Sequence, residues 1–196
     1  MPRPIAVRNA HPRLRIPRGA VAKIISLLDE QFEMLSGDLP HLALPAARMA
    51  VLKSKIKNPK SKTSAVCPPG ELSIVFLTDP ALAKIHADFM DDPTATDVIT
   101  FEGDPAAELA GEICVSADTA ARFVGLPLVG TPRLARTRAL QDAFATELTL
   151  YVVHGWLHLS GYDDLRPAKK RRMRTAEKHA MALLKKAKAI PAFGLT

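Results

Sequence analysis

The sequence contains no long hydrophobic run and little cysteine, and each shortage excludes a class of protein. No apolar stretch reaches the ~18–20 residues that a membrane-spanning helix needs, so we expect no transmembrane segment and no membrane partner. Arginine and proline interrupt every short apolar run in residues 1–18, which argues against a signal-peptide core there. The two cysteines, Cys67 and Cys114, are too few for a disulfide scaffold and form no CxxC pair. These shortages together predict a cytoplasmic protein with reduced thiols.

The sequence also lacks the short motifs that mark several large enzyme classes. It contains no GxxxxGK[ST], no GxGxxG after a strand and no GxSxG, so we expect no nucleotide cofactor and no serine-hydrolase chemistry. The absence of an internal repeat excludes solenoids and propellers. Only ten of the 196 residues are aromatic, so base stacking is not the expected mode of any nucleic-acid recognition.

Apolar residues and positive charge are, by contrast, abundant. Hydrophobic residues make up 47% of the chain, which is enough for the core of one domain of ordinary size. Lysine and arginine number 27 against 20 aspartates and glutamates, a net charge of +7, and the sequence pI is about 9.6. This balance favours a polyanionic partner, with nucleic acid as the first candidate.

Hydrophobic periodicity predicts strands alternating with helices early in the chain and mostly helices later. The expected strands are residues 4–8, 72–77, 97–101 and 112–116. The expected helices are residues 18–35, 78–89, 117–124, 131–159 and 166–188. Residues 190–196 are expected to form a loose tail. This order predicts the α+β class, with a single mixed sheet of about four strands packed with about five helices.

Residues 38–70 differ in composition from the rest of the chain. They contain five prolines and a series of five lysines between positions 53 and 62. We therefore expect a single domain over residues 1–196 that carries a basic Pro/Lys-rich insertion at about 38–70. Two interpretations of the insertion are open, a solvated surface loop and an arm that contacts RNA.

The segment VHGWLHLSGYDD carries the residues best suited to chemistry. His154 and His158 are four residues apart in an expected helix, so both rings lie on one face and can bind a single Zn²⁺. Gly161 can end the helix and let the chain double back. The carboxylate of Asp163 or Asp164 would then approach the imidazoles. Three protein ligands leave a fourth position for water, and zinc lowers the pKa of such a water toward ~7.

Each of these features also has an ordinary structural explanation. Histidine pairs at this spacing occur by chance, Gly161 can be a simple C-cap, and either aspartate could cap the next helix. Their occurrence together within eleven residues favours a metal site. The residue after the first histidine is Gly155, where zinc peptidases of the HExxH type carry a catalytic glutamate, so peptide hydrolysis by that route is not expected.

The segment HGWLHLSGYDD closely resembles the HGxLHLxGYDH signature of the YbeY family, bacterial metal-dependent endoribonucleases that act as rRNA maturation factors. Residues 85–101, which end in TDVITF, resemble the family block LNxxYRxxDxPTDVLSF. GEICVS resembles its GDIxIS strand, and ELSIVF resembles the strand before the first block. The resemblance covers roughly residues 70–185 and implies one α+β domain with a zinc site at the end of the long penultimate helix.

The resemblance also implies a ligand set and a biological role. One Zn²⁺ would be held by His154, His158 and Asp164, and the water on the metal would be the catalytic group. The third histidine of the family falls on Asp164, whose carboxylate oxygen binds Zn²⁺ at about the same distance as imidazole. The implied activity is endonucleolytic hydrolysis of RNA in 16S rRNA 3′-end processing and ribosome quality control.

One departure from the family pattern affects phosphate binding. The arginine of the family's YR pair falls on Met90, and its asparagine falls on His86. Methionine cannot form charged hydrogen bonds to a phosphate. Either another basic residue replaces the missing arginine, with Arg122 and Lys84 as the candidates, or catalysis is weak.

Two basic groups are expected to hold RNA near the metal, although a solvated helix face is the common explanation for such runs. They are Lys169, Lys170, Arg171, Arg172 and Arg174, together with Arg133, Arg136 and Arg138. The sequence thus predicts a zinc-dependent, single-strand-specific endoribonuclease whose partners are rRNA and the small ribosomal subunit. The alternative is a non-catalytic ribosome-assembly factor in which the metal site only stabilises the fold.

Overall fold

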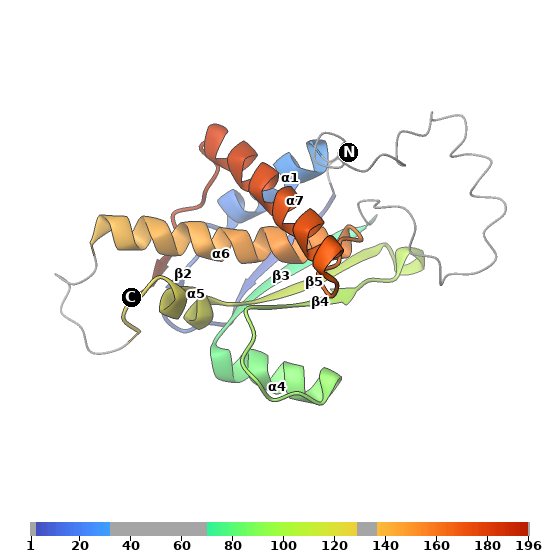
Figure 1. The fold of residues 1–196 in the computed structure, drawn as a ribbon, viewed down its shortest axis with the longest axis horizontal. Coiled ribbons are helices and arrows are strands. Elements are labelled where there is room, and N and C mark those ends of the chain that lie inside the picture. The colour runs from blue at the N-terminus through green and yellow to red at the C-terminus, as the bar shows by residue number, and fades with distance from the viewer. Residues whose placement is uncertain (1–2, 32–69, 129–136, 196) are drawn as a thin grey trace.

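The computed structural model describes residues 3–31, 70–128 and 137–195 (Figure 1). The insertion expected at 38–70 therefore lies almost wholly outside the described residues, as does Cys67. The described elements are β1 (Ile5–Asn9), β2 (Leu14–Arg15), α1 (Arg18–Glu30), β3 (Glu71–Leu77), α4 (Asp79–Met90), β4 (Val98–Glu102), a 3₁₀ turn (Pro105–Ala107), β5 (Leu109–Ser116), α5 (Ala117–Phe123), α6 (Arg138–Leu159), α7 (Pro167–Lys186) and β6 (Gly194–Leu195).

A mixed four-stranded sheet forms the centre of the fold, with strand order β1-β3-β5-β4. Strands β1, β3 and β5 are parallel, and β4 pairs antiparallel with β5 at one edge. The inner strands β3 and β5 are apolar over most of their length because both of their faces are covered. This sheet and the five described α-helices confirm the predicted α+β class.

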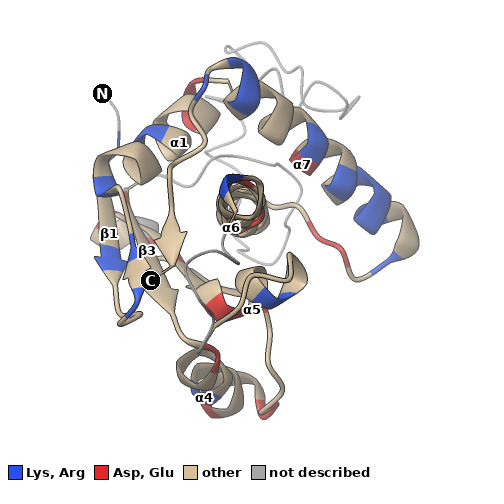
Figure 2. Ribbon diagram, turned by 90° about the vertical axis from the view of Figure 1, so that its left-hand side faces the viewer, with Lys and Arg blue, Asp and Glu red and all other residues tan. Residues whose placement is uncertain are grey.

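Helices cover the two faces of the sheet unequally. Figure 2 looks along α6, which lies on the same side of the sheet as α1 and separates the sheet from α7, while α4 lies on the opposite side. The larger hydrophobic cluster joins the sheet to α1, α5, α6 and α7, and it includes the fully buried Trp156. A smaller cluster beneath α4 contains Val75, Leu77, Leu82, Ile99 and Cys114. Helix α6 is apolar on several sides because it is the central helix of the larger layer.

Gly155 allows α6 to approach the sheet closely. A Cβ atom at this position would lie 2.5 Å from Cγ2 of Ile113 on β5 and 3.2 Å from Cγ2 of Val98 on β4. Any side chain at residue 155 would thus point into the sheet. For this steric reason, a glutamate at the position it occupies in an HExxH peptidase could not be accommodated here. The close approach also sets the distance between the sheet and the turns of α6 on either side of Gly155.

The expectation of a loose C-terminal tail is wrong. Strand β6 pairs antiparallel with β2, which had not been predicted either. Phe193 and Leu195 are each only 3% exposed, and the ring of Phe193 packs against Phe76 with centroids 5.4 Å apart. Two-residue strands give no alternation to detect, but the apolar side chains of the tail gain free energy by burial in the core.

Two helix boundaries also differ from expectation. Helix α6 begins at Arg138 rather than near residue 131, because the hydroxyl of Thr137 accepts a hydrogen bond from the N–H of Leu140 at 3.2 Å and caps the helix there. Helix α1 ends at Glu30 rather than at residue 35, where the N–H of Gln31 closes the last turn on Leu27.

Two further expectations concern membranes and thiols. None of the described helices is long and apolar enough to cross a membrane. Cys114 is a buried free thiol, and burial together with the charge of Glu112 raises its pKa to about 12.

Candidate metal centre

Helix α6 ends in a turn that folds the chain back toward the last two turns of the helix. Gly161 has φ +90°, a left-handed conformation that glycine adopts without steric cost. Its N–H donates to the carbonyl of His158 at 2.9 Å, and the N–H of Tyr162 donates to the carbonyl of Leu157 at 3.0 Å. This pair of bonds is a Schellman motif. The predicted reversal is present, and it brings Asp164 to the histidine face of α6.

Three side chains meet at this end of α6: His154, His158 and Asp164. The two imidazole Nε2 atoms are 2.9 Å apart, and Nε2 of His158 lies 3.9 Å from Oδ1 of Asp164. One ligand atom from each residue lies within 4.8 Å of the other two. Tetrahedral Zn²⁺ with bonds of about 2.0–2.2 Å places its ligand atoms roughly 3.4 Å apart, so small side-chain adjustments suit the ion. No other group of His, Cys, Asp or Glu in the described residues has this spacing.

Hydrogen bonds on the far side of each imidazole fix where the ring proton lies. Nδ1 of His154 donates to Oε1 of Glu177 at 2.5 Å, and Nδ1 of His158 donates to the carbonyl of Tyr162 at 3.2 Å. Because both partners are acceptors, each neutral ring carries its proton on Nδ1, and the two Nε2 lone pairs face each other. Lone pairs 2.9 Å apart repel unless they share a proton or a cation. This donor set, with each ring oriented through its other nitrogen, fits a divalent metal.

Burial and charge separate the pKa values of the two histidines. Burial of the His154 ring lowers its pKa, but the hydrogen bond and charge of Glu177 and the charges of Asp97 and Asp164 outweigh burial and raise the pKa above its usual value. The pKa of His158 lies below its usual value because the ring is buried and faces the charge of His154. A metal ion would therefore compete with a proton held mainly at His154.

The structure distinguishes the two adjacent aspartates that the sequence left open. Oδ1 of Asp163 accepts from the N–H of Leu165 at 2.8 Å, and Oδ2 pairs with Nζ of Lys169 at 2.5 Å. Both oxygens of Asp163 are thus engaged in the loop, and only Asp164 joins the histidines. Neither aspartate caps α7, whose N-cap residue is Arg166.

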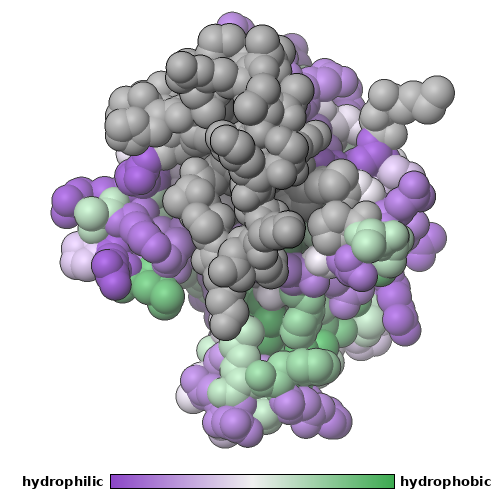
Figure 3. Space-filling model, turned by 90° about the vertical axis from the view of Figure 1, so that its right-hand side faces the viewer, coloured by the Kyte–Doolittle hydropathy of each residue, from purple (hydrophilic) through white to green (hydrophobic). Residues whose placement is uncertain are grey.

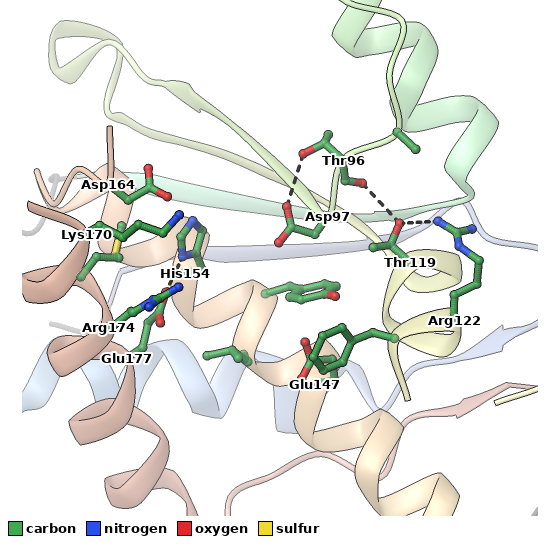
Figure 4. A pocket seen from close by; sticks show the side chains of 15 residues that line it. Thr96, Asp97, Thr119, Arg122, Glu147, His154, Asp164, Lys170, Arg174 and Glu177 are labelled. Atoms are coloured by element: carbon green, nitrogen blue, oxygen red, sulfur yellow. Dashed lines mark hydrogen bonds and ion pairs between the residues drawn. The ribbon is translucent and has the colours of Figure 1, made fainter. Parts of the chain in front are cut away.

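A cavity of about 470 Å³ lies beside these three side chains, and its size is typical of sites for small molecules. His154 and Asp164 form part of its wall, whereas His158 does not line it. The other walls come from α5, α7, the middle of α6 and the residues that lead into β4 (Figure 4). The remaining lining residues are Ala95, Thr96, Asp97, Thr119, Arg122, Phe123, Glu147, Leu150, Tyr151, Lys170, Met173, Arg174 and Glu177.

Figure 4 shows charged groups at both ends of this cavity. At the metal end, Lys170 and Arg174 of α7 lie near His154. Neither cation forms an ion pair with another residue that the structure describes. At the opposite end, which we call the arginine end, Arg122 of α5 lies beside residues that lead into β4. Glu147 precedes His154 by seven residues on the same face of α6, so the floor between them extends roughly 10 Å.

A network of buried and half-buried groups holds Arg122 in place. Its Nη1 pairs with Oδ2 of Asp79, and its Nη2 donates to Oγ1 of Thr119 at 3.1 Å. The N–H of Asp79 donates to Oδ2 of the buried Asp118 at 3.0 Å, and the other oxygen of Asp118 bonds to Nε2 of the buried His11 at 3.0 Å. A guanidinium has five N–H donors, so this anchoring leaves others that can bind a phosphate.

Of the two candidates to replace the missing arginine, the structure places only Arg122 in the cavity wall. Lys84 instead forms an ion pair with Asp88, which lies one turn further along the exposed face of α4. Met90 is half exposed at the end of α4, and Nδ1 of His86 contacts the carbonyl of Thr94 at 3.0 Å. Neither Met90 nor His86 lines the cavity.

The predicted basic groups meet the cavity only in part. Lys170 and Arg174, one turn apart on α7, line it, whereas Lys169 pairs with Asp163 in the loop. Arg171 and Arg172 are exposed and do not line the cavity. Arg138 does not converge on the cavity, because it begins α6 sixteen residues before the first histidine, roughly 24 Å away by the helical rise. Its companions at 133 and 136 lie outside the described residues.

Four ionisable residues of the cavity were not predicted as site residues. Glu177 is the only acidic residue in α7, and a lone carboxylate in such a basic helix was a usable signal. Glu147 and Tyr151 lie on the face of α6 that carries the first histidine, seven and three residues before it. Burial raises the pKa of Glu147 despite its hydrogen bond with Tyr151. Asp97 had been noted only as part of a strand.

Comparison with known proteins identifies relatives of this chain. The family described as endoribonuclease YbeY matches residues 43–185, more than half of the chain. The chain belongs to the YbeY family. Endoribonuclease YbeY of Chlamydia pneumoniae is 37% identical over 125 residues, which cover 61% of this chain and 73% of that protein. The YbeY protein of Lysinibacillus sphaericus is 29% identical over 133 residues, which cover 67% of this chain and 83% of that protein.

A solution structure from Thermotoga maritima aligns with 96% of this chain and covers 94% of its own, with 17% identity and a TM-score of 0.45. A likeness of this size supports no argument about fold or function. The matches to the YbeY family confirm the resemblance predicted from the motifs. The named activity of this family is that of an RNA-cleaving hydrolase.

Proposed function

We propose that this protein is a metal-dependent endoribonuclease that cuts single-stranded regions of ribosomal RNA. In this proposal His154, His158 and Asp164 bind one Zn²⁺, and the RNA lies along the cavity with the scissile phosphate at the metal end. The expected setting is the cytoplasm, with the small ribosomal subunit as partner. The expected roles are 16S rRNA 3′-end processing and ribosome quality control.

The observation that carries this proposal is the meeting of three ligand atoms within 4.8 Å beside a cavity of about 470 Å³. Structural zinc sites use four protein ligands, whereas catalytic sites use three and leave one position open to solvent or substrate. Two histidines and one carboxylate next to an open cavity correspond to the catalytic pattern. Family membership adds the expectation that RNA is the substrate.

Some residues of the site orient the metal ligands, and others bind phosphates of the RNA. Glu177 and the carbonyl of Tyr162 hold the two rings so that both Nε2 atoms face inward. Lys170 and Arg174 neutralise the phosphate at the metal end. When bound, a divalent ion supplies Lewis-acid stabilisation and a water of lowered pKa. Arg122 binds a second phosphate at the arginine end.

One observation favours the second candidate, a non-catalytic ribosome-assembly factor. The position that resembles the family arginine is Met90, which is 52% exposed and does not line the cavity. Methionine at this position cannot form a charged hydrogen bond to a phosphate, so catalysis depends on Arg122 supplying that interaction instead. In the alternative, the metal would only stabilise the turn after α6.

The two candidates differ in what happens to RNA when the metal is removed. The protein is incubated with an RNA that spans the 3′ end of 16S rRNA, first as purified, then after chelation, and then with Zn²⁺ restored. The endoribonuclease proposal predicts cleavage that is lost on chelation and returns with Zn²⁺. Partners that only orient metal ligands contribute about 10–100-fold, so we expect Asp164→Ala to lower cleavage by about 100-fold or more.

Asp163→Ala is the matched control, because Asp163 is adjacent in sequence but engages Leu165 and Lys169 instead of the histidines. It should cleave at close to the wild-type rate. Cleavage that persists in the chelator contradicts the mechanism. A zinc-loaded protein that binds small subunits but cuts no RNA establishes the assembly-factor alternative.

A further inference from the structure

Two aromatic side chains line the cavity, and they differ sharply in exposure. Tyr151 on α6 is buried in the floor, whereas the side chain of Phe123, the last residue of α5, is 73% exposed in the wall. A single exposed phenylalanine on a protein surface is ordinary. Its position in the wall of a cavity that also contains phosphate-binding cations makes Phe123 informative.

The orientation of α5 explains why this ring faces the cavity. The buried side of the helix consists of small residues, Ala117, Ala120 and Ala121, which pack in the larger core. Arg122 and Phe123 follow these residues and fall on the other side, where both line the cavity. The ring of Phe123 therefore adds little to the core and offers an apolar face in the wall of the cavity that Arg122 also lines.

A cavity lined by both cations and an exposed aromatic ring has the groups that bind single-stranded nucleic acids. Such strands are held by cations along the backbone and by aromatic rings on which the unpaired bases stack. Here the cations stand at both ends of the cavity, Lys170 and Arg174 near the metal ligands and Arg122 at the arginine end. The ring of Phe123 follows Arg122 directly in the chain.

We propose that Arg122 and Phe123 form a nucleotide subsite, in which Arg122 binds a backbone phosphate of single-stranded RNA and Phe123 stacks on an adjoining base. This inference rests on the proposed function and deepens it. A base in a duplex is not available for stacking, so the subsite selects single-stranded RNA. All four bases have a π-face, so the subsite does not read sequence. It also revises the expectation that base stacking is not the mode of recognition.

The chain offers a matched control in Phe89 on α4. Its side chain is 71% exposed, almost the same as that of Phe123, but it does not line the cavity. Its ring packs edge-on against Phe101 with centroids 5.0 Å apart. Apolar side chains gather at the lower end of the face seen in Figure 3, where α4 lies. A non-specific apolar contact with RNA would therefore involve Phe89 at least as much as Phe123.

The test measures equilibrium binding of a fluorescently labelled single-stranded oligoribonucleotide with a chelator present, so that no RNA is cut. Base–aromatic stacking predicts that Phe123→Ala weakens binding by about 5- to 150-fold. Phe123→Trp, which keeps an aromatic face, should bind at least as tightly as the wild type. Phe123→Leu, which keeps apolar volume without a π-face, should remain weak. Phe89→Ala should bind normally, and duplex RNA should not distinguish the variants.

A second experiment removes a base from the RNA instead of the aromatic ring from the protein. Abasic substitutions scanned along the oligonucleotide should reveal one position whose loss weakens wild-type binding and has no further effect on Phe123→Ala. Equal RNA binding by Phe123→Ala and Phe89→Ala overturns the inference, as does wild-type protein that binds no RNA in the chelator. Because this assay needs no cleavage, an inactive protein with Phe123-dependent binding refutes only the nuclease. An active nuclease indifferent to Phe123 refutes only the subsite.

Discussion

The two ends of the cavity are built in opposite ways. At the metal end, the three candidate ligands come from one turn of α6 and the loop that follows, within eleven residues of sequence. The arginine end is assembled from α4, α5 and the residues before β4, and its central ion pair joins Asp79 to Arg122, 43 residues apart. Local helical spacing is sufficient to create the first end, whereas the second exists only after the sheet has formed.

Sheet topology explains how the arginine end comes together. Strands β3 and β5 are parallel neighbours, so both reach the same edge of the sheet at their carboxyl ends. Helix α4 begins two residues after β3, and α5 begins directly after β5. Their first turns therefore meet, and Asp79 of α4 accepts hydrogen bonds from Ser116 and Thr119 at the start of α5. The comparison indicates that a mutation at one end of the cavity should leave the function of the other end intact.

The largest expected effect is at the metal end. Replacing His158 by Ala removes an imidazole whose Nε2 faces that of His154, so we expect zinc to be lost and RNA cleavage to fall by about 100-fold or more. RNA binding in the chelator should stay close to the wild-type value, because the cations are untouched. Metal analysis and a binding titration check both statements. A parallel loss of RNA binding would show that the two ends are not independent.

A smaller effect is expected from Glu177→Gln, which keeps the shape of the side chain but removes the charge beside His154. Outer partners of metal ligands contribute about 10–100-fold, so zinc affinity should fall by this factor. Since Glu177 raises the pKa of His154, the variant should show a lower His154 pKa in the metal-free protein. Competition with a chromophoric chelator and an NMR titration of the ring measure the two changes. Unchanged affinity would mean that Glu177 does not orient the ligand.

These contrasts also show how much could be predicted from sequence. The four strands of the central sheet and the five helices follow from periodicity, and the facing pair His154 and His158 follows from helical spacing, all of which are local properties. The choice of Asp164 over Asp163 came from the resemblance to the family signature. The pairing of β2 with β6 involves only two residues on each strand, too few to give an alternating pattern. The placement of Arg122 beside Asp79 depends on sheet order, which no local window contains.

At the arginine end we expect Arg122→Ala to weaken binding of single-stranded RNA by about tenfold or more, the contribution of a charged hydrogen bond to phosphate. The slope of log K against log salt should fall by about 0.7, the value for one phosphate contact in single strands. Zinc content should not change. Lys84→Ala removes a charge from the exposed face of α4 and should leave both quantities unaltered. Equal effects of the two variants would show that Arg122 contributes only non-specific positive charge to RNA binding.

The smallest expected effect concerns the close contact that supports both ends. In Gly155→Ala the new Cβ would meet Ile113 at 2.5 Å, so the free energy of unfolding should fall by about 1–3 kcal/mol. Gly19→Ala on α1 meets no atom within 4 Å and should instead gain about 0.4–1 kcal/mol. Denaturant unfolding of the two variants should therefore give shifts of opposite sign. Equal stabilisation of both would show that α6 lies less close to the sheet.

The most direct test of the account is the zinc content of three proteins purified in parallel: the wild type, Asp164→Ala and Asp163→Ala. The two variants lose the same charge at neighbouring positions, but only Asp164 approaches the histidines. The account predicts one zinc per chain in the wild type and in Asp163→Ala, and zinc affinity lower by about 100-fold or more in Asp164→Ala. Equal zinc binding by the two variants, or a wild-type protein that binds none, would contradict it.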